Sequence, residues 1–248
     1  MAKKRILTFL LVILLLSIFS IVYPHLTGQV SKQIEYPLES ATLLRVLDGD
    51  TIEIDSGPHV RLLGINTPEK KMPFSNESAN FLKQFVGKKI TLERDKEDTD
   101  KYKRKLRYIY YENRFLNLEI LEQGLANSYY TVGLKYEKEV LNAEKQAKDL
   151  EIGIWTKSSE ICSDCIKLKE LNAKEEYFII FNQCNYNCVL DKWFVKDAGR
   201  NTFYLSNLSS GQEKTYESPD NKEIWNNEGD RFFLFDNKGF LATFYSYP

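Results

Sequence analysis

The side chains that could perform chemistry in this sequence are carboxylates and arginines. Only two histidines are present, His25 and His59, which argues against a histidine-based triad or a multi-histidine metal cage. Acidic side chains gather in two segments, 46–51 (VLDGDT) and 61–69 (RLLGINTPE). Oxygen ligands at the ends of neighbouring strands could converge on a hard cation such as Ca²⁺. An Asp-Gly turn alone is more often only a hairpin, so the metal-site hypothesis depends on both segments.

Basic residues cluster in one part of the chain although the formal net charge is −1. Between Lys83 and Arg107 there are ten basic and five acidic residues, with Tyr102 among them and Tyr108 directly after them. A near-neutral chain does not attract a polyanion as a whole, so a nucleic-acid site would depend on this local cluster. A solvated charged surface is the alternative interpretation.

The N-terminus carries a basic triplet at 3–5 (KKR), followed by an apolar stretch at 6–23. This pattern is typical of an export signal or a membrane anchor, and the basic flank predicts that residues 24–248 lie outside the cytoplasm. The absence of an A-x-A-like cleavage site favours an uncleaved signal anchor over a signal peptide. Residues 1–37 are therefore predicted to be the anchor and a short polar stalk.

Four cysteines occur as two close pairs, Cys162 with Cys165 and Cys184 with Cys188. An even number of cysteines outside the cytoplasm suggests disulfides, whereas two close pairs also suit a structural Zn²⁺ site. The spacing does not decide between them, and either interpretation makes the cysteines structural.

Two β-rich regions are expected to follow the stalk. The first is predicted at 38–157 as a five-stranded, oligonucleotide-binding-type barrel with three helices. Its strands are expected at 41–47, 51–54, 59–65, 90–94 and 106–111, and its helices at 76–86, 117–123 and 136–150. A cysteine-containing linker is expected at 158–171, and short alternating strands predict an immunoglobulin-like β-sandwich at 172–248. The fold class is thus mainly β with helices.

The first region closely resembles the thermonuclease family over about 120 residues. The resemblance is carried by VLDGDT, RLLGINTPE, TDKYKRKLRYIY at 99–110, LEQGLA at 121–126 and GIW at 153–155, in the order and spacing of that family. It implies a Ca²⁺-dependent nuclease acting on DNA or RNA with low sequence specificity.

The resemblance also implies a role for each matching residue. Asp50, Asn66 and the backbone carbonyl of Thr67 would ligate Ca²⁺, and Asp48 would support them from outside the ligand shell. Glu69 would act as general base or orient the attacking water, while Arg61 and Arg104 would clamp the phosphate. The expected substrate-binding residues are Lys101 and Tyr102, which would hold a neighbouring phosphate, and Tyr130, which would stack on a base. For Lys101 and Tyr130 the alternatives are a solvated charge and a core aromatic.

One departure from the family bears on activity. The family usually has Asp where this chain has Asn66, so the site loses one negative charge and should bind a cation less tightly. Val132 also stands where the family often has a tyrosine, which would reduce base stacking.

The second region resembles the lamin-tail domain through 190–205 (LDKWFVKDAGRNTFYL), 223–241 and the terminal YSY. Trp193 and Trp225 are expected to pack in its core. The resemblance implies tethering, or binding of nucleic acid, protein or an envelope polymer.

Three hypotheses follow for the whole chain, which is expected to be a monomer. The first is an active extracytoplasmic nuclease. The second is a catalytically inactive nucleic-acid-binding or scaffold protein that lost turnover through Asn66. The third is a structural surface protein dominated by its sandwich.

Overall fold

The computed structural model describes residues 36–219 and 222–247. The predicted signal anchor at 6–23 lies outside these ranges. Within them, no helix has both the length and the apolar character needed to cross a membrane.

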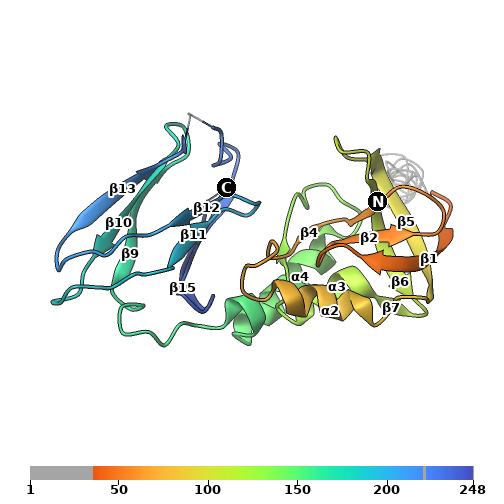
Figure 1. Ribbon diagram of the computed structural model, residues 1–248. Helices are drawn as coiled ribbons and strands as arrows, with labels where there is room; N and C mark the ends of the chain where they lie inside the picture. The colour runs from red at the N-terminus through yellow and green to blue at the C-terminus, as the bar shows by residue number, and fades with distance from the viewer. Residues whose placement is uncertain (1–35, 220–221, 248) are drawn as a thin grey trace, which may run out of the picture. The chain divides into compact units, whose positions relative to one another are not determined.

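The N-terminal region is a closed five-stranded barrel, as the sequence predicts. The strand order is β3-β2-β1-β5-β6, and the parallel pairing of β3 with β6 closes the barrel (Figure 1). Because apolar and polar residues alternate along the strands, the apolar side chains point into the barrel, where Leu43, Ile52 and Leu92 are fully buried. The strands span Glu39–Val46 (β1), Thr51–Ile54 (β2), Val60–Leu62 (β3), Lys89–Thr99 (β5) and Lys105–Tyr111 (β6), and Arg114–Phe115 (β7) extends the sheet.

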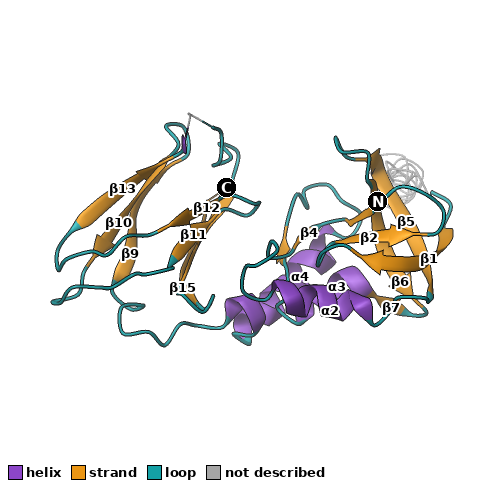
Figure 2. Ribbon diagram, viewed as in Figure 1, coloured by secondary structure: helices purple, strands orange, loops and turns teal. Residues whose placement is uncertain are grey.

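Three helices pack against this barrel and are grouped beside it in Figure 2. They are α2 (Ser75–Lys83), α3 (Leu116–Glu122) and α4 (Glu137–Asp149). In α4 the buried Val140, Ala143 and Ala147 recur at helical spacing, so one face enters the core. Glu144 of the same helix is also buried. A small ladder pairs β4 (Ile65–Asn66), which follows β3, with β8 (Asn127–Ser128), which follows α3, and holds the backbone of Asn66 in place.

The C-terminal region forms two antiparallel sheets, consistent with the predicted β-sandwich. One has the order β13-β10-β9 and the other β12-β11-β14-β15. Trp193 and Trp225 are 3% and 1% exposed, so the prediction that they pack in the core is confirmed. The strands span Ile166–Asn172 (β9), Tyr177–Asn182 (β10), Phe194–Lys196 (β11), Thr202–Tyr204 (β12), Glu213–Glu217 (β13), Asp230–Phe235 (β14) and Leu241–Tyr247 (β15).

The predicted linker at 158–171 differs from the structure. Strand β9 begins at Ile166 and pairs with β10, so the second half of that segment belongs to a sheet. Its sequence, IKLKELN, alternates apolar and charged residues in the manner of a strand with one exposed face.

The four cysteines form two disulfides, which decides between the disulfide and Zn²⁺ interpretations that their spacing allows. Cys162 pairs with Cys188, and Cys165 pairs with Cys184. All four thiols are thereby used, so a structural Zn²⁺ at these cysteines is not supported. The disulfides join the segment that leaves the barrel to the loop after β10.

The two regions share a packed boundary within residues 37–248, which form one compact unit. Trp155, from the short 3-10 helix Gly153–Trp155, lies against Phe233 and Phe244 with ring centroids 5.6 and 5.4 Å away. The backbone N–H of Leu241 donates to the carbonyl of Thr156 at 2.7 Å. Apolar burial of this kind stabilises association by about 25 cal/mol per Å², so the sandwich is docked on the barrel region rather than loosely tethered to it.

Candidate active site

Asp50 lies at the centre of the candidate site, in the turn between β1 and β2. This turn comes close to the segment after β4 because Gly49 has no side chain. A Cβ at Gly49 would lie 2.5 Å from the Cβ of Ser78 and 2.6 Å from Oγ1 of Thr67, distances that require the neighbouring atoms to move. The glycine therefore brings together the two acidic segments that the sequence singles out.

Asp50 is buried, with 5% of its surface exposed. Both oxygens of its carboxylate have polar partners. Nε of Arg61 lies 3.1 Å from Oδ1, and the Thr51 hydroxyl donates to the same oxygen at 3.0 Å. The backbone N–H and hydroxyl of Thr67 donate to Oδ2 at 3.0 and 3.1 Å. Burial alone would raise the pKa of Asp50, but the Arg61 charge and these hydrogen bonds lower it, so the carboxylate stays ionised.

Asp48 adds a second carboxylate, whose Oδ1 accepts the backbone N–H of Asp50 at 3.1 Å. Burial, followed by the nearby negative charge of Asp50, raises the pKa of Asp48. Two carboxylates thus share a partly buried site in which Arg61 forms the direct ion pair with Asp50. An oxygen-rich donor set with surplus negative charge fits a hard divalent cation such as Ca²⁺.

Both predicted arginines are joined to Asp50. Arg61 contacts it directly, and Nη2 of Arg61 also donates to Oδ1 of Asn66 at 3.1 Å. Arg104 reaches it through Thr51, because Nη1 of Arg104 donates to the Thr51 hydroxyl at 3.2 Å. The Asp100 carboxylate holds the other edge of Arg104 at 2.7 Å. The structure therefore gathers two guanidinium groups around one carboxylate, the arrangement that phosphate binding requires.

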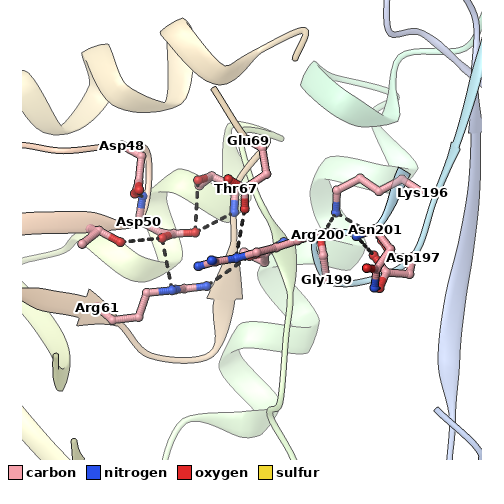
Figure 3. A network of polar contacts seen from close by, with 12 residues as sticks. Asp48, Asp50, Arg61, Thr67, Glu69, Lys196, Asp197, Gly199, Arg200 and Asn201 are labelled. Atoms are coloured by element: carbon pink, nitrogen blue, oxygen red, sulfur yellow. Dashed lines mark hydrogen bonds and ion pairs between the residues drawn. The ribbon is translucent and has the colours of Figure 1, made fainter. Parts of the chain in front are cut away.

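Glu69 lies in the loop that follows β4, and its side chain is 44% exposed. Its Oε1 is 3.1 Å from Nε of Arg200, a residue of the C-terminal region. Figure 3 shows Arg61 and Arg200 approaching the region of Asp50 and Glu69 from opposite sides. A half-exposed carboxylate beside buried charged groups can contact solvent water and an incoming substrate at the same time.

Asn66 makes contacts that its predicted role as a metal ligand does not include. Its amide nitrogen donates to the backbone carbonyls of Ala198 and Gly199 at 3.2 and 3.0 Å, while its oxygen accepts from Arg61. An aspartate at this position could not donate these two bonds. The amide thus links the barrel region to the C-terminal region.

The predicted substrate-binding residues lie at the surface. Tyr102 is 61% exposed, with Nζ of Lys101 and Cζ of Arg104 at 5.2 and 5.5 Å from its ring centroid. Tyr130 is 70% exposed and packs against Tyr129, with ring centroids 4.2 Å apart. The alternative that Tyr130 is a core aromatic is therefore wrong.

Two functional features were missed by reasoning from the sequence. Thr51 connects Arg104 to Asp50, and its place beside Asp50 in VLDGDT is a signal that could have identified it. Arg200 lies 131 positions after Glu69, and no local pattern links the two residues. Only the docking of the two regions brings them together.

Comparisons with known proteins agree with this geometry. Residues 59–157 match the family model described as staphylococcal nuclease homologue. The chain is 33% identical to the thermonuclease of Staphylococcus hyicus over 125 residues, which are 46% of this chain and 74% of that protein. It is 34% identical to the thermonuclease of Staphylococcus intermedius over 128 residues, 47% of this chain and 76% of that protein. It is also 33% identical to endonuclease YncB of Bacillus subtilis (strain 168) over 147 residues, 52% of this chain and 70% of that protein.

The barrel, its charged site and these similarities define a hydrolytic nuclease. The chain belongs to the staphylococcal nuclease homologue family. The family model begins at His59, so Asp48 and Asp50 lie before the matched range, and their membership of the site comes from the contacts described above.

Proposed function

We propose that this chain is an extracytoplasmic, Ca²⁺-dependent nuclease that hydrolyses phosphodiester bonds of DNA, RNA or both with low sequence specificity. The observation that carries the proposal is the connection of Asp50 to Arg61 directly and to Arg104 through Thr51. A groove that binds phosphates through guanidinium groups and base faces through tyrosines has little means of reading base edges.

In this proposal Asp50, Asn66 and the Thr67 carbonyl would hold the Ca²⁺, with Asp48 behind them. When bound, the ion polarises a phosphoryl oxygen and neutralises charge on the phosphate. Asn66 would serve through its oxygen, which now accepts from Arg61, because its amide nitrogen is used by the C-terminal region.

The remaining steps belong to the side chains of the chain itself. Glu69 would accept a proton from a water molecule, or orient the water, as the water oxygen forms a bond to phosphorus. The opposite ester bond would break, and its oxygen would leave with the bonding electron pair and take a proton from solvent. Arg61 and Arg104 would bind the equatorial oxygens, where negative charge accumulates. Lys101 and Tyr102 would hold the next phosphate, and Tyr130 would stack on a base.

The extracytoplasmic location is supported by two independent features. The sequence has a basic triplet followed by an apolar stretch at 6–23, which is the pattern of a signal anchor. The C-terminal region carries two disulfides, which persist in oxidising compartments. We further propose that this region is a lamin-tail-like domain that tethers the nuclease or binds nucleic acid, protein or an envelope polymer, and that the chain acts as a monomer.

The test is digestion of supercoiled plasmid and of single-stranded RNA by the full-length protein, with Ca²⁺, with Mg²⁺ and with EDTA. Cleavage with Ca²⁺ that stops in EDTA is expected. Asp50→Asn should abolish it, because the central carboxylate loses its charge. Glu139→Gln, an exposed change on α4, is the matched control and should cleave like the parent. Binding of nucleic acid without Ca²⁺-dependent cutting would instead favour the inactive binding protein.

A further inference from the structure

A loop of the C-terminal region reaches the nuclease site. This loop, residues 197–201, connects β11 to β12 and is called the Arg200 loop below. Figure 3 shows Arg200 extending from it toward Glu69. Because Glu69 is the expected general base, a cationic side chain at this point lies within reach of a bound phosphate.

The Arg200 loop is held in shape by its own region. The Asp197 carboxylate accepts the backbone N–H and the side-chain amide of Asn201 at 2.9 and 2.6 Å. The buried Nζ of Lys196 donates to the carbonyl of Gly199 at 2.5 Å. Asp230 accepts the backbone N–H of Ala198 at 3.2 Å. These bonds order the loop before any substrate arrives, which lowers the entropic cost of using it for binding.

The region that carries the loop is also fixed on the barrel close to the site. Nη1 of Arg231 lies 2.6 Å from Oε1 of Glu144, which also accepts the backbone N–H of Ser128 at 2.6 Å. Asn66 adds its two bonds to the loop carbonyls. The loop that carries Arg200 is therefore held both by bonds within the C-terminal region and by bonds to the barrel region.

The guanidinium of Arg200 is more exposed than those of Arg61 and Arg104. Its side chain is 53% exposed, and within the described parts of the chain its ion pair with Glu69 engages Nε. Arg61 and Arg104 are buried or nearly so and are engaged by several groups each. A phosphate oxygen could therefore bind to the outer nitrogens of this exposed guanidinium.

We propose that Arg200 is a substrate-positioning residue that binds a phosphate of the nucleic-acid backbone next to the scissile one, so that the C-terminal region completes the substrate site. This inference rests on the proposed function. A half-exposed ion pair contributes only about 0–1 kcal/mol. A phosphate can therefore share Arg200 with Glu69, or take it over, at little cost, which distinguishes this contact from an inhibitory lock.

The experiment compares full-length parent protein with Arg200→Ala, Arg200→Lys and the control Lys169→Ala. Lys169 pairs with Glu213 on the sheet that contains β9, so its removal takes one positive charge from the same region outside the loop. Steady-state cleavage of a single-stranded DNA oligonucleotide gives KM and kcat. Binding of the same oligonucleotide in EDTA, measured across salt concentrations, counts the phosphate contacts.

Arg200→Ala is expected to raise KM about tenfold and to change kcat less than threefold, since a remote phosphate contact acts mainly through binding. Its plot of log Kd against log salt should lose about 0.7 in slope, the value for one phosphate contact on a single strand. Arg200→Lys should restore the slope and only part of the KM, because a lysine keeps the charge without the guanidinium fork. Lys169→Ala should match the parent.

A rise in kcat/KM for Arg200→Ala would overturn the proposal in favour of an inhibitory contact. Unchanged KM and salt slope, with an unchanged melting temperature, would also overturn it. If the parent protein binds but does not cut, the proposed function fails, whereas the salt slope still decides the role of Arg200.

Discussion

Replacing Asn66 by aspartate tests how this chain differs from its relatives. The change restores the carboxylate that the thermonuclease family usually has, and it removes both bonds that the amide donates to Ala198 and Gly199 at 3.2 and 3.0 Å. Each such bond contributes about 0.5–1.5 kcal/mol. In EDTA, Asn66→Asp should therefore lower the free energy of unfolding by about 1–3 kcal/mol.

Two further contributions act in opposite directions. The new carboxylate would face two backbone carbonyl oxygens, which is unfavourable, but its other oxygen would strengthen the 3.1 Å contact with Arg61. Added Ca²⁺ should reverse the loss, because a further negative ligand raises affinity for the ion. Asn66→Ala is the comparison variant, since it removes the same two bonds and also the contact with Arg61, without supplying a ligand.

The assay is chemical unfolding of parent, Asn66→Asp and Asn66→Ala in EDTA and at a series of Ca²⁺ concentrations. Asn66→Asp should gain more stability from Ca²⁺ than the parent, and Asn66→Ala should gain less. If Asn66→Asp is as stable as the parent in EDTA, the amide does not link the two regions. If both variants respond to Ca²⁺ alike, position 66 is not at the ion.

Three other changes have defined outcomes. Thr51→Val removes the hydroxyl that joins Arg104 to Asp50, and kcat/KM is expected to fall about tenfold, or ~1.4 kcal/mol. An unchanged cleavage rate would show that this hydroxyl has no part in catalysis. Replacing Cys165 and Cys184 together by serine opens a disulfide with a sequence separation of 19. The free energy of unfolding should fall by about 3 kcal/mol. Elemental analysis of the parent protein should find no zinc. Burial would raise the pKa of Glu39, but hydrogen bonds and charges of Lys105 and Arg107 outweigh it and hold the pKa below its ordinary value of 4.5. The stabilisation of the fold by Glu39 is complete above about pH 4.5 and is lost as the pH falls through the lowered pKa of the folded state. Glu39→Gln should therefore flatten the decline of stability in acid, and an identical acid profile would contradict this.

The barrel could be predicted because its pattern is local. Its strands alternate apolar and polar side chains, and Gly87, with positive φ, follows the first helical segment as expected. Gly64, also with positive φ, instead interrupts the strand expected at 59–65 and separates β3 from β4. The relation of Asp50, Arg61 and Glu69 was predictable for a similar reason, since the two segments follow one another within a short meander.

The contacts between the site and the C-terminal region could not be predicted, because they join residues far apart in the chain. The bonds of Asn66 to the Arg200 loop span 132 and 133 positions, and no periodicity in the sequence reports such a distance. The amide at position 66 was interpreted as a weakened ligand, whereas its nitrogen has a partner of its own. Strand β13 was not predicted because its sequence, EKTYE, is mostly exposed and lacks an apolar alternation.

The most direct measurement of the central claim is single-turnover cleavage of DNA by full-length Glu69→Gln in Ca²⁺, with protein in excess over substrate. The amide keeps the shape of the side chain but accepts a proton poorly, so the cleavage rate should fall at least about a hundredfold. DNA affinity should stay within about threefold of the parent value, because the phosphates are bound by arginines. Cleavage at the parent rate would contradict the account, since the carboxylate beside Asp50 and Arg61 would then have no part in the hydrolysis.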